Sequence, residues 1–343
     1  MIRKLDRAAL HRWVEGLIRA HRVEGVQADG DRFSFRPLQR AGDLRLDYAV
    51  AKIAPKKYFQ PAAEALLKFD AQGNWESVCD AEPFILLGVH PYDMAAILQM
   101  DELFSQKNAD THYAARREQA TIVVVDVQRA SPNVFAGCMG TATIAKGYDV
   151  LLTAVGEDTV LETGSRKGEA ICASLQDAPR ADAVSLGRRE QVWEDNRKYL
   201  RKHELKVAPK DLPALLERSV EHPVWEERAA RCFSCGSCNT VCPTCYCFDV
   251  RDETDWTLKS GARKRFWDGC LLTGFATVSG DHNFRKSRAD RYRHRYFRKG
   301  LYVPSKLSDG AISCVGCGRC ITACVTRIAN PVEVYNRLLE VRP

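Results

Sequence analysis

The chain has 343 residues, of which 45% are hydrophobic, so it is long enough to bury the cores of two domains. Its longest apolar runs, such as Phe84–Val89, have the length of a strand, and none could span a membrane. The N-terminal segment has the pattern of an amphipathic helix rather than of a signal sequence. Its fourteen cysteines are therefore expected in the reducing cytoplasm, without a disulfide framework.

Residues 1–220 are predicted to form an α/β domain. Apolar residues within 10–18 recur at helical spacing and predict an amphipathic helix near the start of the chain. The apolar runs at Phe84–Val89, 121–127 and 149–155 predict buried strands, because a strand covered on both faces is apolar along its whole length.

Two polar features of this domain have both a functional and a structural interpretation. His90 follows the first buried strand, where functional groups often project, but such a histidine more commonly satisfies loop backbone. Asp93 is a plausible N-cap for the helix that follows. The glycine-rich stretch 164–168 could cradle a phosphate, but it lacks the full fingerprint and fits an ordinary turn better. Prolines interrupt the helical sequence of 187–231, which places the domain boundary near residue 220.

Two cysteine runs in the C-terminal part have the spacing of iron–sulfur ligands. The run at 232–247 is CFSCGSCNTVCPTCYC, and the run at 314–324 is CVGCGRCITAC. Each contains C-x2-C-x2-C-x3-C, in which the first three cysteines can wrap around one face of a cubane. Gly236, Gly316 and Gly318 would let backbone amides turn toward the cluster sulfurs. The sequence therefore predicts two 4Fe-4S clusters.

In the bacterial two-cluster arrangement, the fourth cysteine of each run ligates the cluster of the other run. The predicted ligands are Cys232, Cys235, Cys238 and Cys324 for the first cluster, and Cys314, Cys317, Cys320 and Cys242 for the second. Structural zinc is the alternative, but it prefers pairs of C-x2-C knuckles that supply four ligands in total. Residues 221–343 are therefore expected to form a ferredoxin-like domain with two clusters, and the whole chain to be of the α+β class.

An insert at about 248–313 separates the two runs and is expected to be helical. It contains RKRFWDGC and GDHNFRKSRADRYRHRYFRKG, which mix basic and aromatic residues like a nucleic-acid patch. Arginines beside anionic clusters could equally stabilise the clusters or dock a partner. Each oxidised four-thiolate cubane carries a charge of about −2, so the formal net charge of +7 would fall to roughly +3. The basic excess is thus a weak argument for nucleic acid.

The ordered set of motifs resembles the beta subunit of soluble sulfhydrogenases, which are nickel–iron hydrogenases with a flavin-containing NAD(P)H arm. It is also similar to the A-type subunit of anaerobic sulfite reductase. The likeness covers nearly the whole chain and depends on APKKYF, EPFILLGVHPYD, EHPVWEE, CGSCNTVCPTCYC, RKRFWDGC, GDHNFR and CVGCGRC. The resemblance implies an electron-transfer subunit with the same eight cysteines as cluster ligands and with no catalytic residue of its own.

The chain departs from these relatives at several positions. Relatives often carry cysteines near Tyr92, Asp126 and Phe135 that could hold an additional cluster, and only Cys138 remains here. The N-terminal domain is therefore expected to lack a cluster and to serve as an assembly surface. Val325 stands where a proline usually follows the last cysteine, which affects the rigidity of the turn but not ligation.

Three further cysteines match cysteines of the relatives: Cys245, Cys247 and Cys270. With a fourth ligand such as His282 they could hold a third cluster. Alternatively they are buried side chains packed near the first cluster, and the sequence slightly favours this second interpretation. Cys79 and Cys172 are expected to be ordinary interior thiols.

The predicted function is the transfer of single electrons between two partners: a flavin-containing NAD(P)H subunit, and the catalytic and small subunits of a nickel–iron hydrogenase. A component of a sulfite reductase and an iron–sulfur protein acting on nucleic acid are the alternatives. No catalytic triad, phosphate loop or dinucleotide fingerprint stands out, so neither flavin nor NAD is expected on this chain. Arg231 and Arg319, which lie beside the cysteine runs, are candidates for tuning the cluster potentials unless they are solvated.

Overall fold

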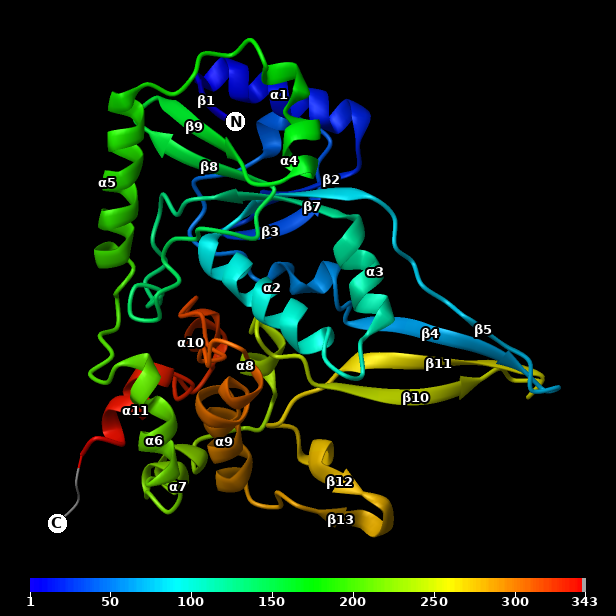
Figure 1. Ribbon diagram of the computed structural model, residues 1–343. Helices are drawn as coiled ribbons and strands as arrows, with labels where there is room; N and C mark the ends of the chain where they lie inside the picture. The colour runs from blue at the N-terminus through cyan, green and yellow to red at the C-terminus, as the bar shows by residue number, and fades with distance from the viewer. Residues whose placement is uncertain (341–343) are drawn as a thin grey trace.

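In the computed structural model, which describes residues 1–340, the N-terminal part is built around a seven-stranded sheet (Figure 1). The strand order is β1-β9-β8-β7-β6-β2-β3, and β2, β6, β7 and β8 are parallel neighbours. The remaining strands pair in the antiparallel sense, β3 at one edge and β9 and β1 at the other. The strands are β1 (Ile2–Leu5), β2 (Val23–Asp29), β3 (Arg32–Pro37), β6 (Phe84–Val89), β7 (Ala120–Val125), β8 (Val150–Val155) and β9 (Asp158–Thr163).

Helices cover both faces of this sheet. In Figure 1, α1 and α4 lie above the sheet, and α2 lies below it. The helices are α1 (Arg7–Ala20), α2 (Pro91–Phe104), α3 (Thr111–Gln119), α4 (Arg166–Ile171) and α5 (Ala183–Tyr199). The predicted first helix is confirmed, with Asp6 as its N-cap and Trp13, Val14 and Leu17 on its buried face. The three predicted strands are confirmed as β6, β7 and β8, and their burial follows from the helices on both sides.

Two local predictions in this domain can be compared with the structure. Asp93 is not the N-cap of α2: His90 occupies that position, and Asp93 lies buried in the first turn. The glycine-rich stretch 164–168 is a turn into α4, in which the side chain of Ser165 accepts a hydrogen bond from the amide of Gly168 over 3.1 Å. A helix-terminal amide that would face a phosphate is therefore used inside the turn.

A second, four-stranded sheet forms an arm that projects away from the body of the molecule (Figure 1). Its strands are antiparallel in the order β10-β11-β4-β5, with bounds β4 (Ala63–Asp70), β5 (Trp75–Ser77), β10 (Phe248–Thr254) and β11 (Ser260–Trp267). The insert at 248–313 is thus helical only in its second half, because its first half is a hairpin that pairs with a strand almost 200 residues upstream. The boundary near residue 220 stays a prediction, and this sheet joins strands from both sides of it.

Short helices make up most of the C-terminal part and enclose a second core. These are α6 (Leu212–Glu217), α7 (Val224–Ala229), α8 (Ser237–Thr240), α9 (Arg288–Phe297), α10 (Arg319–Ala323) and α11 (Pro331–Arg337), and β12 (Thr277–Val278) pairs with β13 (His282–Asn283). Trp225, Tyr292, Tyr296 and Tyr335 pack together in this core. Together the two parts confirm the predicted α+β class.

Candidate metal centres

The two cysteine runs fold into matching turns. Ser234 and Gly316 occupy corresponding positions with φ angles of 54° and 65°, and Gly236 and Gly318 have φ angles of 70° and 76°. These left-handed residues turn the backbone inward just before α8 and α10, which contact each other. The amide of Ser234 donates a hydrogen bond to Sγ of Cys232 over 3.4 Å. The amide of Ser234 is thus available to a cysteine sulfur, although Ser234 is not one of the glycine positions named from the sequence.

The first cavity lies where the first run meets the end of the second. Four cysteines line it: Cys232, Cys235, Cys238 and Cys324. Leu271, Tyr292 and Ile328 are buried in its wall, whereas Phe233 and Val325 are 71% and 78% exposed. One side of this cavity is therefore close to the protein surface.

The second cavity is more deeply buried. Four cysteines line it: Cys242, Cys314, Cys317 and Cys320. Phe135 and Pro331 help to close it. Burial raises the pKa of the Cys314 thiol to about 11 and that of Cys317 to about 12, because a thiolate is poorly solvated there. Stable thiolates at this site therefore need positive charge or metal nearby.

Two buried cations supply positive charge at the second cavity. The ammonium group of Lys299 donates hydrogen bonds to Sγ of Cys242 over 3.2 Å and to the hydroxyl of Thr244 over 2.8 Å. Arg295 is 1% exposed, and none of its three guanidinium nitrogens has a hydrogen-bond partner within residues 1–340. A buried arginine without an anionic partner is costly, so the charge of Arg295 is suited to an anionic group in the cavity.

The basic and aromatic segment of the insert folds as α9 and the turn after it. Arg291, Arg295 and Lys299 are buried, as are Tyr292 and Tyr296. Their spacing at three and four residues places them on one side of the helix, toward the cysteine cavities. This side of the segment faces inward and does not form an exposed nucleic-acid patch.

A buried ion pair joins the second cysteine run to the N-terminal domain. Arg319, the first residue of α10, contacts both carboxylate oxygens of Asp93 on α2, at 2.5 and 2.7 Å. Its Nε also donates to the carbonyl of Ala51 over 2.7 Å. Arg319 is therefore buried rather than solvated, whereas Arg231 is exposed and donates to the carbonyl of Thr326 over 3.0 Å.

A third, small cavity brings together the three remaining cysteines of the C-terminal part: Cys245, Cys247 and Cys270. Arg295 and Lys299 line this cavity as well as the second one. His282, which was considered as a fourth ligand, does not line it. The His282 side chain is exposed and packs edge-on against Phe284, with ring centroids 4.7 Å apart.

Polar and thiol groups of the N-terminal domain are mostly structural. The His90 ring stacks on Tyr48 at 3.9 Å, and its Nδ1 lies 2.5 Å from the hydroxyl of Tyr92. Burial lowers the pKa of His90, which therefore stays neutral. Cys138 donates to the carbonyl of His203 over 3.3 Å. Cys172 is buried as predicted, but Cys79 is exposed because the segment between β5 and β6 runs over the surface.

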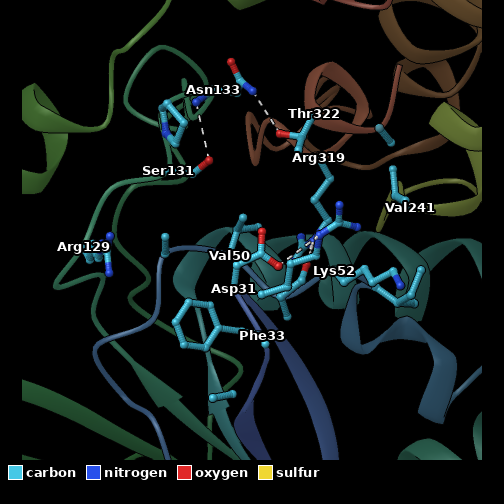
Figure 2. A pocket seen from close by; sticks show the side chains of 18 of the residues that line it. Asp31, Phe33, Val50, Lys52, Arg129, Ser131, Asn133, Val241, Arg319 and Thr322 are labelled. Atoms are coloured by element: carbon cyan, nitrogen blue, oxygen red, sulfur yellow. Dashed lines mark hydrogen bonds and ion pairs between the residues drawn. The ribbon is translucent and has the colours of Figure 1, made fainter. Parts of the chain in front are cut away.

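A wider cavity, of about 930 Å³, lies between the N-terminal domain and the helices that follow the cysteine turns (Figure 2). Lys52 and Arg129 line its N-terminal side, and Val241 and Thr322 line the side of α8 and α10. The side-chain amide of Asn133 donates to the hydroxyl of Thr322 over 2.9 Å and so bridges the two sides. Sequence reasoning missed this cavity, because its walls come from segments nearly 200 residues apart.

The four cysteines of each set surround a cavity rather than a single point. Within residues 1–340, no group of three or more His, Cys, Asp or Glu side chains is arranged to hold one metal ion. A cubane differs from an ion in that each of its irons takes one thiolate, so its cysteines stand apart around it. Arginines of the insert were expected near the clusters, but Lys299 and Arg295 were not singled out, although their spacing of four along a helix was a usable signal.

This arrangement is typical of an iron–sulfur protein, and the family model for the 4Fe-4S dicluster domain matches residues 231–328. The chain is also 31% identical over 322 residues to the sulfhydrogenase 2 subunit beta of Pyrococcus furiosus, covering 93% of this chain and 92% of that protein. It therefore belongs to the family of sulfhydrogenase beta subunits and is an iron–sulfur electron-transfer subunit. Within residues 1–340, no helix is long and apolar enough to cross a membrane.

Proposed function

We propose that this chain relays single electrons through two 4Fe-4S clusters held by its eight motif cysteines. The observation that carries the proposal is that these cysteines line two cavities, four to each. Each cavity takes three cysteines from one run and the fourth from the other run, so Cys324 belongs to the first and Cys242 to the second. Cross-ligation would make the two clusters one rigid unit.

The chain's own side chains fit an anionic redox group in these cavities. A bound cluster accepts and donates one electron at a time. Apolar walls such as Phe135 and Leu271 exclude water, and Lys299 and Arg295 offset the negative charge. The amide of Ser234 donates to a cysteine sulfur, which stabilises the thiolate.

We propose further that the partners are a flavin-containing NAD(P)H subunit on one side and a nickel–iron hydrogenase module on the other. This proposal follows the similarity to a sulfhydrogenase beta subunit. A sulfite reductase complex is the second candidate, because the same relay would serve it. The third candidate, action on nucleic acid, has less support, since Arg291, Arg295 and Lys299 of the basic segment are buried. A reducing cytoplasm is the proposed location, because iron ligation needs reduced cysteines and none of the cysteines within residues 1–340 forms a disulfide.

Two exposed apolar features are suited to contact with other subunits. Phe233 and Val325 flank the first cavity, where an electron could pass to a partner over a short distance. Trp75, Trp256 and Leu258 are 70%, 100% and 74% exposed in and beside the strands of the projecting arm. Exposed aromatic residues of this kind are typical of protein interfaces.

Anaerobic copurification of the native complex, with nickel, flavin, sirohaem and iron measured on one sample, tests the proposal. Nickel with flavin is the expected result and would assign the chain to a hydrogenase. Sirohaem without nickel would overturn that assignment in favour of a sulfite reductase. Fewer than roughly eight irons per chain would refute the two-cluster relay itself. Salt-dependent binding of nucleic acid with a steep slope would favour the third candidate.

A further inference from the structure

The third cavity is built by segments that are far apart along the chain. Cys245 and Cys247 come from the end of the first run, and Cys270 follows β11. Side chains from the segment before β4 hydrogen-bond to the backbone of the loop that carries Cys245 and Cys247. Lys56 donates to the carbonyl of Cys245 over 2.7 Å, and Gln60 donates to the carbonyl of Tyr246 over 3.2 Å. The position of this loop is thus set by contacts with residues nearly 190 positions earlier in the chain.

The surroundings of the three thiols are strongly positive. Arg295, Arg298 and Lys299 line the cavity, and no carboxylate of the described residues lines it. Lys56 lies beside it, 5% exposed, with its ammonium 4.2 Å from the centroid of the Trp267 ring. Four cations around three neutral thiols would be unfavourable in a buried site, because charges removed from water need compensation. The cavity is therefore suited to an anionic occupant.

Polar groups in the wall point to ligation rather than to ordinary packing. The side-chain amide of Asn239 lies 3.7 Å from Sγ of Cys245 and 3.5 Å from Sγ of Cys270, so it can donate to both thiolates. Its Oδ1 and the hydroxyl of Ser313 are buried without a hydrogen-bond partner within residues 1–340. Gly269 leaves room for Asn239, since a Cβ there would lie 2.9 Å from Oδ1. Buried polar atoms without partners are rare, and a bound cluster would use the Ser313 hydroxyl as a hydrogen-bond donor or as an iron ligand.

We propose that Cys245, Cys247 and Cys270 hold a third 4Fe-4S cluster, whose fourth iron is left to an oxygen ligand. Ser313 is the protein oxygen best suited to that role, because it lines the cavity and its hydroxyl has no partner among residues 1–340. A zinc ion is the other acceptor of three thiolates, and with them it would carry the same net charge of about −1 as an oxidised cubane core, so metal analysis separates the two.

The third cluster would extend the relay, because Arg295 and Lys299 line both the second and the third cavity. Only these side chains and their neighbours separate the two sites. An electron placed in either cavity would therefore be stabilised by the same two cations. The third cavity lies toward β10 and β11, so the relay would reach from the exposed first cavity to the base of the arm.

The test is the iron content of the anaerobically purified and reconstituted full chain, with zinc measured on the same sample. Roughly twelve irons per chain are expected in the wild-type protein, and Cys247→Ala with Cys270→Ala should remove about four and leave about eight. The eight remaining irons would show that the variant is folded. Cys172→Ala, which removes a buried thiol outside the cavities, is the matched control and should keep all twelve.

Three outcomes would overturn the inference. One is a wild-type chain with only about eight irons, another is a double variant that keeps all its iron, and the third is about one zinc per chain that is lost with these cysteines. The inference does not depend on the two-cluster proposal. Cys317→Ala should remove about four irons from the second cavity while Cys247 and Cys270 still hold theirs, so failure of either proposal would be seen separately.

Discussion

Replacing Asp93 by alanine is expected to loosen the second cysteine run far more than a surface substitution would. Asp93 and Arg319 have side chains that are 0% and 2% exposed, so each shields the charge of the other. Breaking a buried pair leaves one uncompensated charge, which costs about 3–5 kcal/mol. Because about 1.4 kcal/mol corresponds to tenfold, the unfolding rate of Asp93→Ala should rise about 100-fold or more if the pair is lost in the transition state.

The assay is the unfolding rate of the anaerobic holoprotein in guanidinium, followed by the visible absorbance of the clusters and by tryptophan fluorescence. The combined variant Asp93→Leu with Arg319→Met removes both charges, and such replacements are often close to neutral. It is therefore expected to unfold at least tenfold more slowly than Asp93→Ala alone. Arg337→Met is the control, because Arg337 and Glu227 form an exposed pair worth less than about 1 kcal/mol.

The reasoning would be refuted if the combined variant unfolded as fast as Asp93→Ala. That result would mean that the lost packing, rather than the uncompensated charge of Arg319, causes the destabilisation. Equal rates for Asp93→Ala and the Arg337→Met control would refute it as well, because the buried pair would then contribute no more than a surface pair. Loss of absorbance before loss of fluorescence would localise the effect to the cluster turns near Cys317 and Cys320.

Three further predictions concern single side chains. Burial raises the pKa of the Asp126 carboxyl from 3.8 to about 6. The stability that this group contributes is therefore full below pH 3.8, where it is protonated, and is lost as the pH rises through 6. In thermal unfolding, Asp126→Asn should be about 3 kcal/mol more stable than the wild type at pH 8 and similar to it at pH 4. Gly316→Ala should reduce iron retention whereas Gly310→Ala should not, because both have φ near 65° but only the Cβ at 316 would meet backbone, 2.6 Å from Ala136 N. Lys299→Met should lower the potentials of the clusters in the second and third cavities in redox titration, by roughly 70–140 mV, and the exposed Arg231→Met should leave all cluster potentials nearly unchanged.

Much of the local structure followed from short-range patterns. The strands β6, β7 and β8 were predicted because they are apolar along their length, and α1 because its apolar residues recur at helical spacing. The predicted N-cap of α2 was wrong by three residues, because the Asp93 carboxylate pairs with the distant Arg319 and does not cap the helix. The prediction of a helical insert was only half correct, because its first half forms the strands β10 and β11, of which β11 also pairs with β4.

By itself, the sequence determined the two cysteine turns and the family of the chain. In each run, two residues separate each of the first three cysteines from the next, and a glycine precedes the short helix. This pattern specifies a turn whose geometry depends on adjacent residues alone. Only the tertiary structure decided which side chains surround the cysteines. Arg295 and Lys299 face the cavities, Arg319 meets Asp93, and Lys56 reaches the loop of Cys245, because these contacts join segments that pack together only when both domains have folded. Spacing along the chain carries no information about such contacts.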